Sequence, residues 1–245
     1  MALAPQLHYF ACRSRGEPIR LLCALANLEY EEYSVPEMQD NGRRQLPPPA
    51  GDPTPRYLDS GAGRLADPLQ FPFGTCPKWV DGDLVINQSN AILRHVARQT
   101  GFGGRNEAET ASVDAWLEHC EDIRKAYNDV IYGLDLPPFD ETLTNDDPRA
   151  VAAYEAHAPA VASSFRPFER RLQTSTVLVG ERLTAADVAL ADLTDVHLKL
   201  WSGVLSEADF PKLMDHNTRV FQQPGIAAYI ASGRRWGRLN GNALG

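Results

Sequence analysis

Residues 74–98 constrain the fold of this chain more than any other stretch. Two short apolar runs flank a turn at 81–83 that contains a glycine, and this arrangement is typical of a β-hairpin. Polar residues follow, and then apolar residues at helical spacing, so a helix is expected to begin near Ser89. Pro77 precedes the first strand of the hairpin, and its missing N–H group indicates an edge strand or a turn. The stretch predicts a hairpin that leads directly into a helix.

The expected start of that helix is suited to bind an anion. Its first N–H groups lack partners within the helix and carry the positive end of the helix dipole, so a carboxylate at Ser89 would meet donors. The peptide groups of Cys76, just before the proline, are expected to be open to an extended peptide at the sheet edge. These features indicate a site for a small acidic peptide, and the alternative is an ordinary hairpin with a capped helix.

Composition excludes several classes of protein. The chain has 245 residues, of which 43% are hydrophobic, and this is enough to build one or two globular domains. Its net charge of −8 argues against a nucleic-acid or anionic-membrane partner, because both need a basic surface. The sequence has no long apolar run, no secretion signal and no cysteine spacing typical of metal sites. A reduced cytoplasmic protein without a metal is therefore expected.

The order of the expected elements indicates two domains. A strand at 6–10, a helix from Pro18 and a strand at 31–35 precede the hairpin and its helix. This is the order of an α/β thioredoxin-like domain. After Gly101 the apolar pattern is helical throughout, beginning with a long amphipathic helix at 106–132. The second domain is therefore expected to be all-helical.

Two further patterns concern the helical part. Pro148 is expected to begin a helix, and Pro159 and Pro167 are expected to kink or interrupt it. Residues 183–188 form a capping box with an apolar staple. We interpret the capping box as a folding signal and not as a chemical site.

The segment from Cys76 to His95 resembles the glutathione-binding segment of cytosolic glutathione transferases, most closely the pi class and then the mu and sigma classes. Its Gln-Ser-Asn motif at 88–90 is specific, and the likeness covers nearly the whole chain. The resemblance implies the glutathione transferase fold, with a thioredoxin-like glutathione-binding domain at 1–99. An all-helical domain at 106–245 would hold the electrophile pocket and the dimer contacts. The implied protein is a cytoplasmic homodimer that conjugates its co-substrate glutathione to hydrophobic electrophiles in detoxification.

The resemblance also implies a catalytic role for Tyr9, because the motif Tyr-Phe-x-x-Arg-x-Arg that begins there matches the start of pi-class chains. A free thiol with a pKa near 8.5 is only about 3% ionised at pH 7, and lowering that pKa by two units costs about 2.7 kcal/mol. A phenol that donates a hydrogen bond to the sulfur could supply much of this energy. Cys12 and then Ser14 are the alternatives to Tyr9.

The remaining site residues follow from matching positions. Those expected to bind glutathione are Tyr9, Arg15, Arg44, Thr75, Cys76, Pro77, Gln88, Ser89 and Asp122, the last of these reaching the glutathione of the other subunit. Those expected to line the electrophile pocket are Phe10, Cys12, Tyr132 and Gly241. Phe73 matches the aromatic residue that inserts into the partner subunit as a dimer key.

The chain also departs from the pi-class pattern. Met38 stands where the pattern has a tryptophan that binds the glycine carboxylate of glutathione, and residues 45–73 form a longer, proline-rich loop. These departures keep open the alternative of a non-catalytic glutathione-binding or structural relative. A further alternative is a sigma-like isomerase that uses glutathione as a cofactor.

Overall fold

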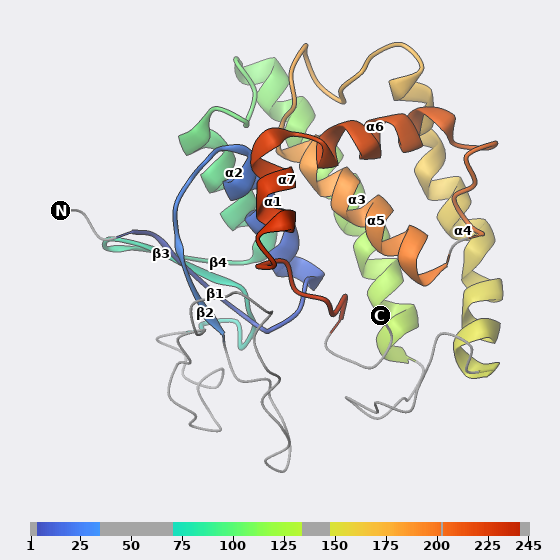
Figure 1. The fold of residues 1–245 in the computed structure, drawn as a ribbon, viewed down its shortest axis with the longest axis horizontal. Coiled ribbons are helices and arrows are strands. Elements are labelled where there is room, and N and C mark those ends of the chain that lie inside the picture. Colours follow the sequence, from blue (N-terminus) through green and yellow to red (C-terminus); the bar gives the residue numbers. More distant parts are fainter. Residues whose placement is uncertain (1–3, 35–70, 134–147, 202, 241–245) are drawn as a thin grey trace. The chain divides into compact units, whose positions relative to one another are not determined.

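The computed structural model describes residues 4–34, 71–133, 148–201 and 203–240. These residues form two compact units (Figure 1). The first unit contains the chain up to Thr100 together with the segment that begins at Pro224, and the second runs from Gly101 to Gln223. The domain boundaries expected from the sequence, 1–99 and 106–245, stay a prediction.

Within the described residues, the first unit contains a sheet of four strands in the order β2-β1-β3-β4. β1 and β2 are parallel, whereas β3 is antiparallel to both β1 and β4. The strands are β1 (Gln6–Tyr9), β2 (Glu31–Ser34), β3 (Lys78–Asp81) and β4 (Leu84–Asn87). The expected hairpin is confirmed as β3 and β4, joined at Gly82, whose φ of +60° suits a glycine.

Of the two alternatives for Pro77, an edge strand or a turn, the edge strand is wrong. β3 lies between β1 and β4 and so pairs on both sides. The sheet tolerates the proline because Pro77 lies outside the strand, which begins at Lys78, so its missing N–H group removes no bond within the strand. The Cys76–Pro77 peptide bond is cis.

Helices pack against one another beside this sheet (Figure 1), and their bounds are η1 (Ser14–Gly16), α1 (Glu17–Leu25), α2 (Ser89–Thr100) and α7 (Pro224–Ala231). The expected helix start at Ser89 is confirmed. α1 packs against α2 and α7, and Ile19, Leu22 and Ile92 are fully buried. α7 approaches α1 so closely that a Cβ atom on Gly225 would collide with the carbonyl oxygen of Ala24.

The described part of the second unit is helical, as expected. Its helices are α3 (Glu107–Gly133), α4 (Pro148–Leu172), α5 (Ala185–Leu200) and α6 (Pro211–Phe221). The expectation that Pro159 and Pro167 could interrupt α4 is wrong, because the helix runs through both. A proline inside a helix costs about 3 kcal/mol, and burying a phenylalanine side chain contributes about 1.5–3 kcal/mol. The two prolines of α4 together cost about 6 kcal/mol, and the burial of Phe165 and Phe168, both fully buried, offsets about 3–6 kcal/mol of that cost.

The capping box at the start of α5 is confirmed as a folding element. Asp187 is fully buried, and its carboxylate accepts the backbone N–H of Thr184 at 2.8 Å and that of Leu178 at 2.9 Å. The same carboxylate lies 2.9 Å from Nε2 of His216. These bonds join the start of α5 to the preceding loop and to α6.

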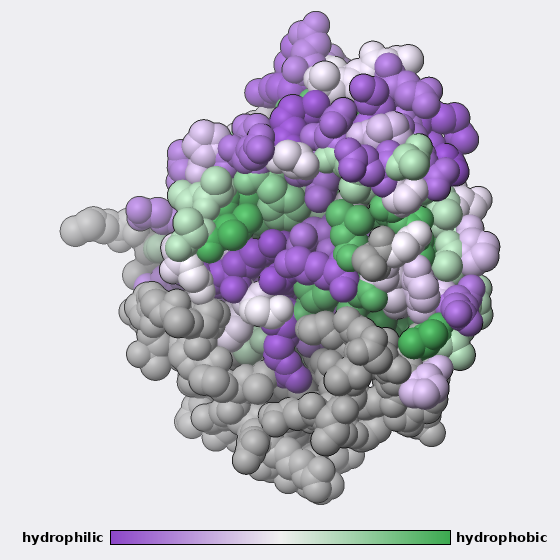
Figure 2. Space-filling model, turned by 45° about the vertical axis from the view of Figure 1, so that its right-hand side comes forward, coloured by the Kyte–Doolittle hydropathy of each residue, from purple (hydrophilic) through white to green (hydrophobic). Residues whose placement is uncertain are grey.

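Large hydrophobic side chains are seldom exposed among the described residues. On the face drawn in Figure 2, hydrophilic residues separate the hydrophobic ones into several patches. The exposed large hydrophobic residues are Phe73, Leu84, Val85 and Val151. In the part of the chain that the structure describes, no helix is both long and apolar enough to cross a membrane.

Candidate functional site

One end of the sheet collects many of the residues expected in the site. His8 pairs with Lys78, and Lys78 pairs with Asn87. The next residues along the strands, namely Tyr9, Pro77 and Gln88, therefore lie at the same end of the sheet. Both α1, through the loop that follows β1, and α2 begin at this end. Local hairpin geometry and strand pairing thus bring together three segments that are far apart in the sequence.

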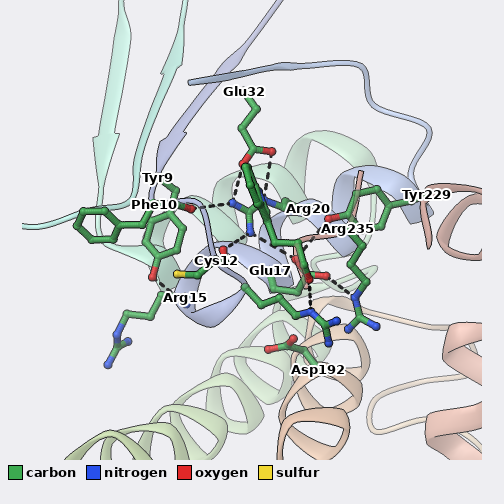
Figure 3. A network of polar contacts seen from close by, with 12 residues as sticks. Tyr9, Phe10, Cys12, Arg15, Glu17, Arg20, Glu32, Asp192, Tyr229 and Arg235 are labelled. Carbon is green, nitrogen blue, oxygen red and sulfur yellow. Dashed lines mark hydrogen bonds and ion pairs between the residues drawn. The ribbon is translucent and has the colours of Figure 1, made fainter. Parts of the chain in front are cut away.

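Tyr9 is held on two sides. Its side chain is 4% exposed, and its hydroxyl oxygen accepts the backbone N–H of Arg15 at 3.0 Å (Figure 3). A Cβ atom on Gly16 would lie 2.5 Å from Cδ1 of Tyr9, so the ring packs directly on the glycine. A hydroxyl group has one donor and two acceptor positions, so accepting from Arg15 is compatible with donating to a ligand sulfur.

The two alternatives to Tyr9 lie in the loop after β1. Cys12 is buried, with 1% of its side chain exposed, and its carbonyl oxygen accepts a bond from Arg20. Ser14 is half-buried, has a φ of +32°, and donates its backbone N–H to the carbonyl oxygen of Leu239 at 2.9 Å. In both residues the backbone holds the loop in place beside Tyr9.

Cys76 is built into the wall of this region. Cys76 and Phe10 both pack against the buried ring of Phe71, and the ammonium group of Lys78 lies 4.7 Å from the centroid of that ring. Burial raises the pKa of the Cys76 thiol to about 12, although Lys78 acts in the opposite direction. The thiol is therefore protonated at neutral pH, and what it offers a ligand is its backbone.

The start of α2 contains an unusual backbone conformation. Gln88, between β4 and α2, has a φ of +77°, in the left-handed region that few residues other than glycine adopt. Such strained residues cluster at binding sites. The carbonyl oxygen of Gln88 accepts the N–H of Ile92 at 3.0 Å, which closes the first turn of the helix. Gln88 is exposed and Ser89 is half-buried, so this helix start is accessible to a ligand.

The remaining expected site residues are exposed or lie outside the residues that the structure describes. Thr75 is exposed in the first unit, and Asp122 is exposed on α3 in the second. Tyr132 belongs to α3, but its side chain is outside the described residues, as are Arg44 and Gly241. Phe73 is 61% exposed.

A buried ionic network next to the loop was not predicted from the sequence (Figure 3). Arg20 is fully buried, and its guanidinium lies 2.6 Å from Glu32 and 3.4 Å from Glu17. Burial alone would lower the pKa of Arg20, but these carboxylates raise it well above its usual value. Glu17 also accepts bonds from Arg235 at 2.7 Å and from the hydroxyl of Tyr229 at 3.3 Å. The sequence could have predicted the contact between Glu17 and Arg20, because the two residues lie one helical turn apart. No pattern in the sequence predicts the contact between Glu17 and Arg235.

The chain is similar to glutathione S-transferases over most of its length. A family model described as the C-terminal domain of glutathione S-transferase matches residues 135–224. Glutathione S-transferase P 1 of Xenopus laevis is 31% identical over 230 residues, which cover 94% of this chain and 92% of that relative. Glutathione S-transferase P of Homo sapiens is 34% identical over 164 residues, or 65% of this chain and 70% of the relative.

A solved structure extends the similarity. The pi-class glutathione S-transferase of Onchocerca volvulus has a TM-score of 0.71 and 25% identity, and the match covers 99% of this chain and 100% of that one. A glutathione S-transferase structure from Caenorhabditis elegans has a TM-score of 0.68 and 27% identity, covering 94% of this chain and 98% of that one.

Proposed function

The chain belongs to the glutathione S-transferase family, and from this premise we propose that it joins the sulfur of glutathione to hydrophobic electrophiles, with Tyr9 as the residue that stabilises the thiolate. The observation that carries the role of Tyr9 is its position. Its hydroxyl is fixed by the N–H of Arg15 at the same sheet end as the start of α2.

In the proposed reaction the thiol of glutathione first loses its proton to solvent. The Tyr9 hydroxyl donates a hydrogen bond to the resulting thiolate, and bonds to charged groups contribute about 1.5–3 kcal/mol. The sulfur then uses an electron pair to form a bond to the electrophilic carbon, and the leaving group departs with its own bonding pair. Holding the two reactants in the correct orientation supplies the rest of the rate enhancement.

The binding of the tripeptide is proposed from the geometry of the first unit. The γ-glutamyl carboxylate would lie at the start of α2, where Ser89 and the first N–H groups act as donors. The backbone of Cys76, beside Pro77, would pair with the extended tripeptide. Arg15 would add a positive charge near the loop. The roles of Thr75 and Gln88, and those of Arg44, Asp122, Tyr132 and Gly241, stay predictions.

We also propose that the protein is a cytoplasmic homodimer that acts in detoxification, with Phe73 as the dimer key. A phenylalanine that is 61% exposed is suited to insertion into a partner. The substitution Phe73→Asp should shift the protein to the monomer in sedimentation experiments. Val151→Asp is the matched control, because Val151 is also an exposed apolar residue and is 37% exposed. If Phe73→Asp is monomeric and Val151→Asp remains a dimer, the proposal is supported. If both variants remain dimers, the proposal is overturned.

The reaction is tested by retention on immobilised glutathione and by conjugation of an activated aryl halide. Tyr9→Phe should lower kcat/KM at pH 6.5 by roughly 10- to 100-fold, because the lost bond is worth about 1.5–3 kcal/mol. It should also move the midpoint of the pH–rate profile upward.

Cys12→Ala separates the alternatives, since it should keep the midpoint of the wild type. An unchanged profile in Tyr9→Phe together with a shifted one in Cys12→Ala would assign the role to Cys12. Retention on glutathione without any turnover would instead favour the non-catalytic relative.

A further inference from the structure

The loop that connects β1 to α1 is held by two sets of bonds to its backbone. From one side, Nη1 of Arg20 donates to the carbonyl oxygen of Cys12 at 2.8 Å, and Nη2 donates to that of Phe10 at 3.4 Å. From the other side, the N–H of Arg13 donates to the carbonyl oxygen of Arg238 at 2.9 Å. This loop leads to Arg15, whose N–H binds the Tyr9 hydroxyl, so the position of the loop decides the geometry of that contact.

Two carboxylates fix the direction in which Arg20 points (Figure 3). Glu32 receives bonds from Nε at 3.0 Å and from Nη2 at 2.6 Å. Glu17 lies 3.4 Å from Nη1, the same nitrogen that binds the carbonyl oxygen of Cys12. The carboxylates and the two loop carbonyls therefore share the donors of one guanidinium group, and any change in the pull of Glu17 changes the bonds to the loop.

The segment after α7 donates a hydrogen bond to each of the two carboxylates. Nε of Arg235 donates to Glu17 at 2.7 Å, and Nε1 of Trp236 donates to Glu32 at 3.3 Å. Glu17 thus contacts two arginines, Arg235 at 2.7 Å and Arg20 at 3.4 Å. Without Arg235, Glu17 would lose the shorter of these two contacts, and its carboxylate would draw Nη1 of Arg20 toward it and away from the loop. Buried ion pairs respond strongly to the loss of one partner.

We propose that Arg235 is a positioning residue for Tyr9: it neutralises Glu17 so that Arg20 keeps the loop, and with it the N–H of Arg15, in place against the Tyr9 hydroxyl. Trp236 assists by holding Glu32. The inference rests on the proposed function, because it concerns the acidity of glutathione at the same site. Its main effect is on the thiol pKa of bound glutathione, because the contact that it positions joins the Arg15 N–H to the Tyr9 hydroxyl.

The experiment measures that thiol pKa by titrating the ultraviolet absorbance of the thiolate in the complex of the full chain with glutathione. Arg235→Met should raise the thiol pKa by about one unit, which is about tenfold less thiolate at a given pH below the pKa. The Kd for glutathione should change by less than about threefold at a pH where the thiol is protonated. Arg235→Lys, which keeps the charge, should keep the thiol pKa close to the wild-type value.

Arg234→Met is the matched control. Arg234 neighbours Arg235 and lies over the ring of Tyr30, and its removal should leave the thiol pKa at the wild-type value. If Arg235→Met fails to fold, Trp236→Phe removes the donor to Glu32 while keeping an aromatic ring, and a smaller shift in the same direction is expected.

A double-mutant cycle tests the route. In a Tyr9→Phe background, Arg235→Met should have no further effect on the thiol pKa, because Arg235 acts through Tyr9. Equal shifts in both backgrounds would overturn the proposal, as would an unchanged pKa in folded Arg235→Met. A wild-type chain that fails to bind glutathione, or that binds it with an unshifted thiol pKa, would overturn the proposed function instead.

Discussion

At the scale of single residues, the site depends on how closely Gly16 approaches Tyr9. An added Cβ atom at Gly16 would lie 2.5 Å from Cδ1, 3.0 Å from Cγ and 3.1 Å from Cε1 of the tyrosine ring. The ring therefore stands where it does only because position 16 has no side chain. The Arg15 N–H is in the adjacent residue, so the same turn sets both the ring and its hydrogen-bond donor.

Gly16→Ala should displace the Tyr9 ring and lower kcat/KM for the aryl halide by about tenfold or more, because misplacement of a reacting group by about 1 Å can cost up to 10²-fold. The free energy of unfolding should fall by about 1–3 kcal/mol, as expected for overpacking. Gly237→Ala is the control, since a Cβ atom there meets no atom within 4 Å. Equal activity of the two variants would show that the ring position does not matter.

At the scale of elements, sequence reasoning succeeded where the determining contacts are local. The hairpin at Gly82, the start of α2 at Ser89 and the capping box at Asp187 each depend on residues only a few positions apart. The interior position of β3 could not be predicted, because it depends on pairing with β1, more than 60 residues earlier. The contact between Glu17 and Arg235 joins residues 218 positions apart, and no local sequence pattern predicts it.

Asp187→Ala should lower the free energy of unfolding by about 3 kcal/mol, because buried donors on Thr184, Leu178 and His216 would lose their acceptor. Urea unfolding measures this change. Asp195→Ala, on the same helix, is the control: Asp195 is half-buried and lies 3.4 Å from Lys199, one turn away. Such surface pairs contribute about 0.5 kcal/mol. A loss at Asp187 no larger than that of the control would contradict the importance of the cap.

At the scale of the whole molecule, each unit contains a buried histidine that is neutral when folded. Burial, with a contribution from Lys78, lowers the pKa of His8 to about 4. Burial also lowers the pKa of His197 to about 4, although its bond to the Leu193 carbonyl acts in the opposite direction. An unfolded histidine has a pKa near 6.5, so protons bind the unfolded chain more tightly than the folded one.

The free energy of unfolding should therefore be constant above about pH 7 and should fall as the pH drops from 6.5 toward 4. Between pH 7.5 and pH 5 each histidine should contribute a loss of about 2 kcal/mol. Urea unfolding at a series of pH values measures the slope. His8→Asn and His197→Asn should each reduce it, and a slope that is unchanged in both variants would contradict the assignment.

The first unit is assembled from two segments that are far apart in the sequence, since α7 packs on α1 and the residues after α7 bind the loop beside Tyr9. A ribosome therefore synthesises residues 101–223 of the second unit before it releases the residues that complete the first. Until residues 224–240 have been synthesised, α1 has no cover on its α7 side and the loop beside Tyr9 lacks its bonds to Arg238 and Leu239. We therefore expect a premature stop codon after Gln223 to leave every residue of the sheet in place and still abolish activity.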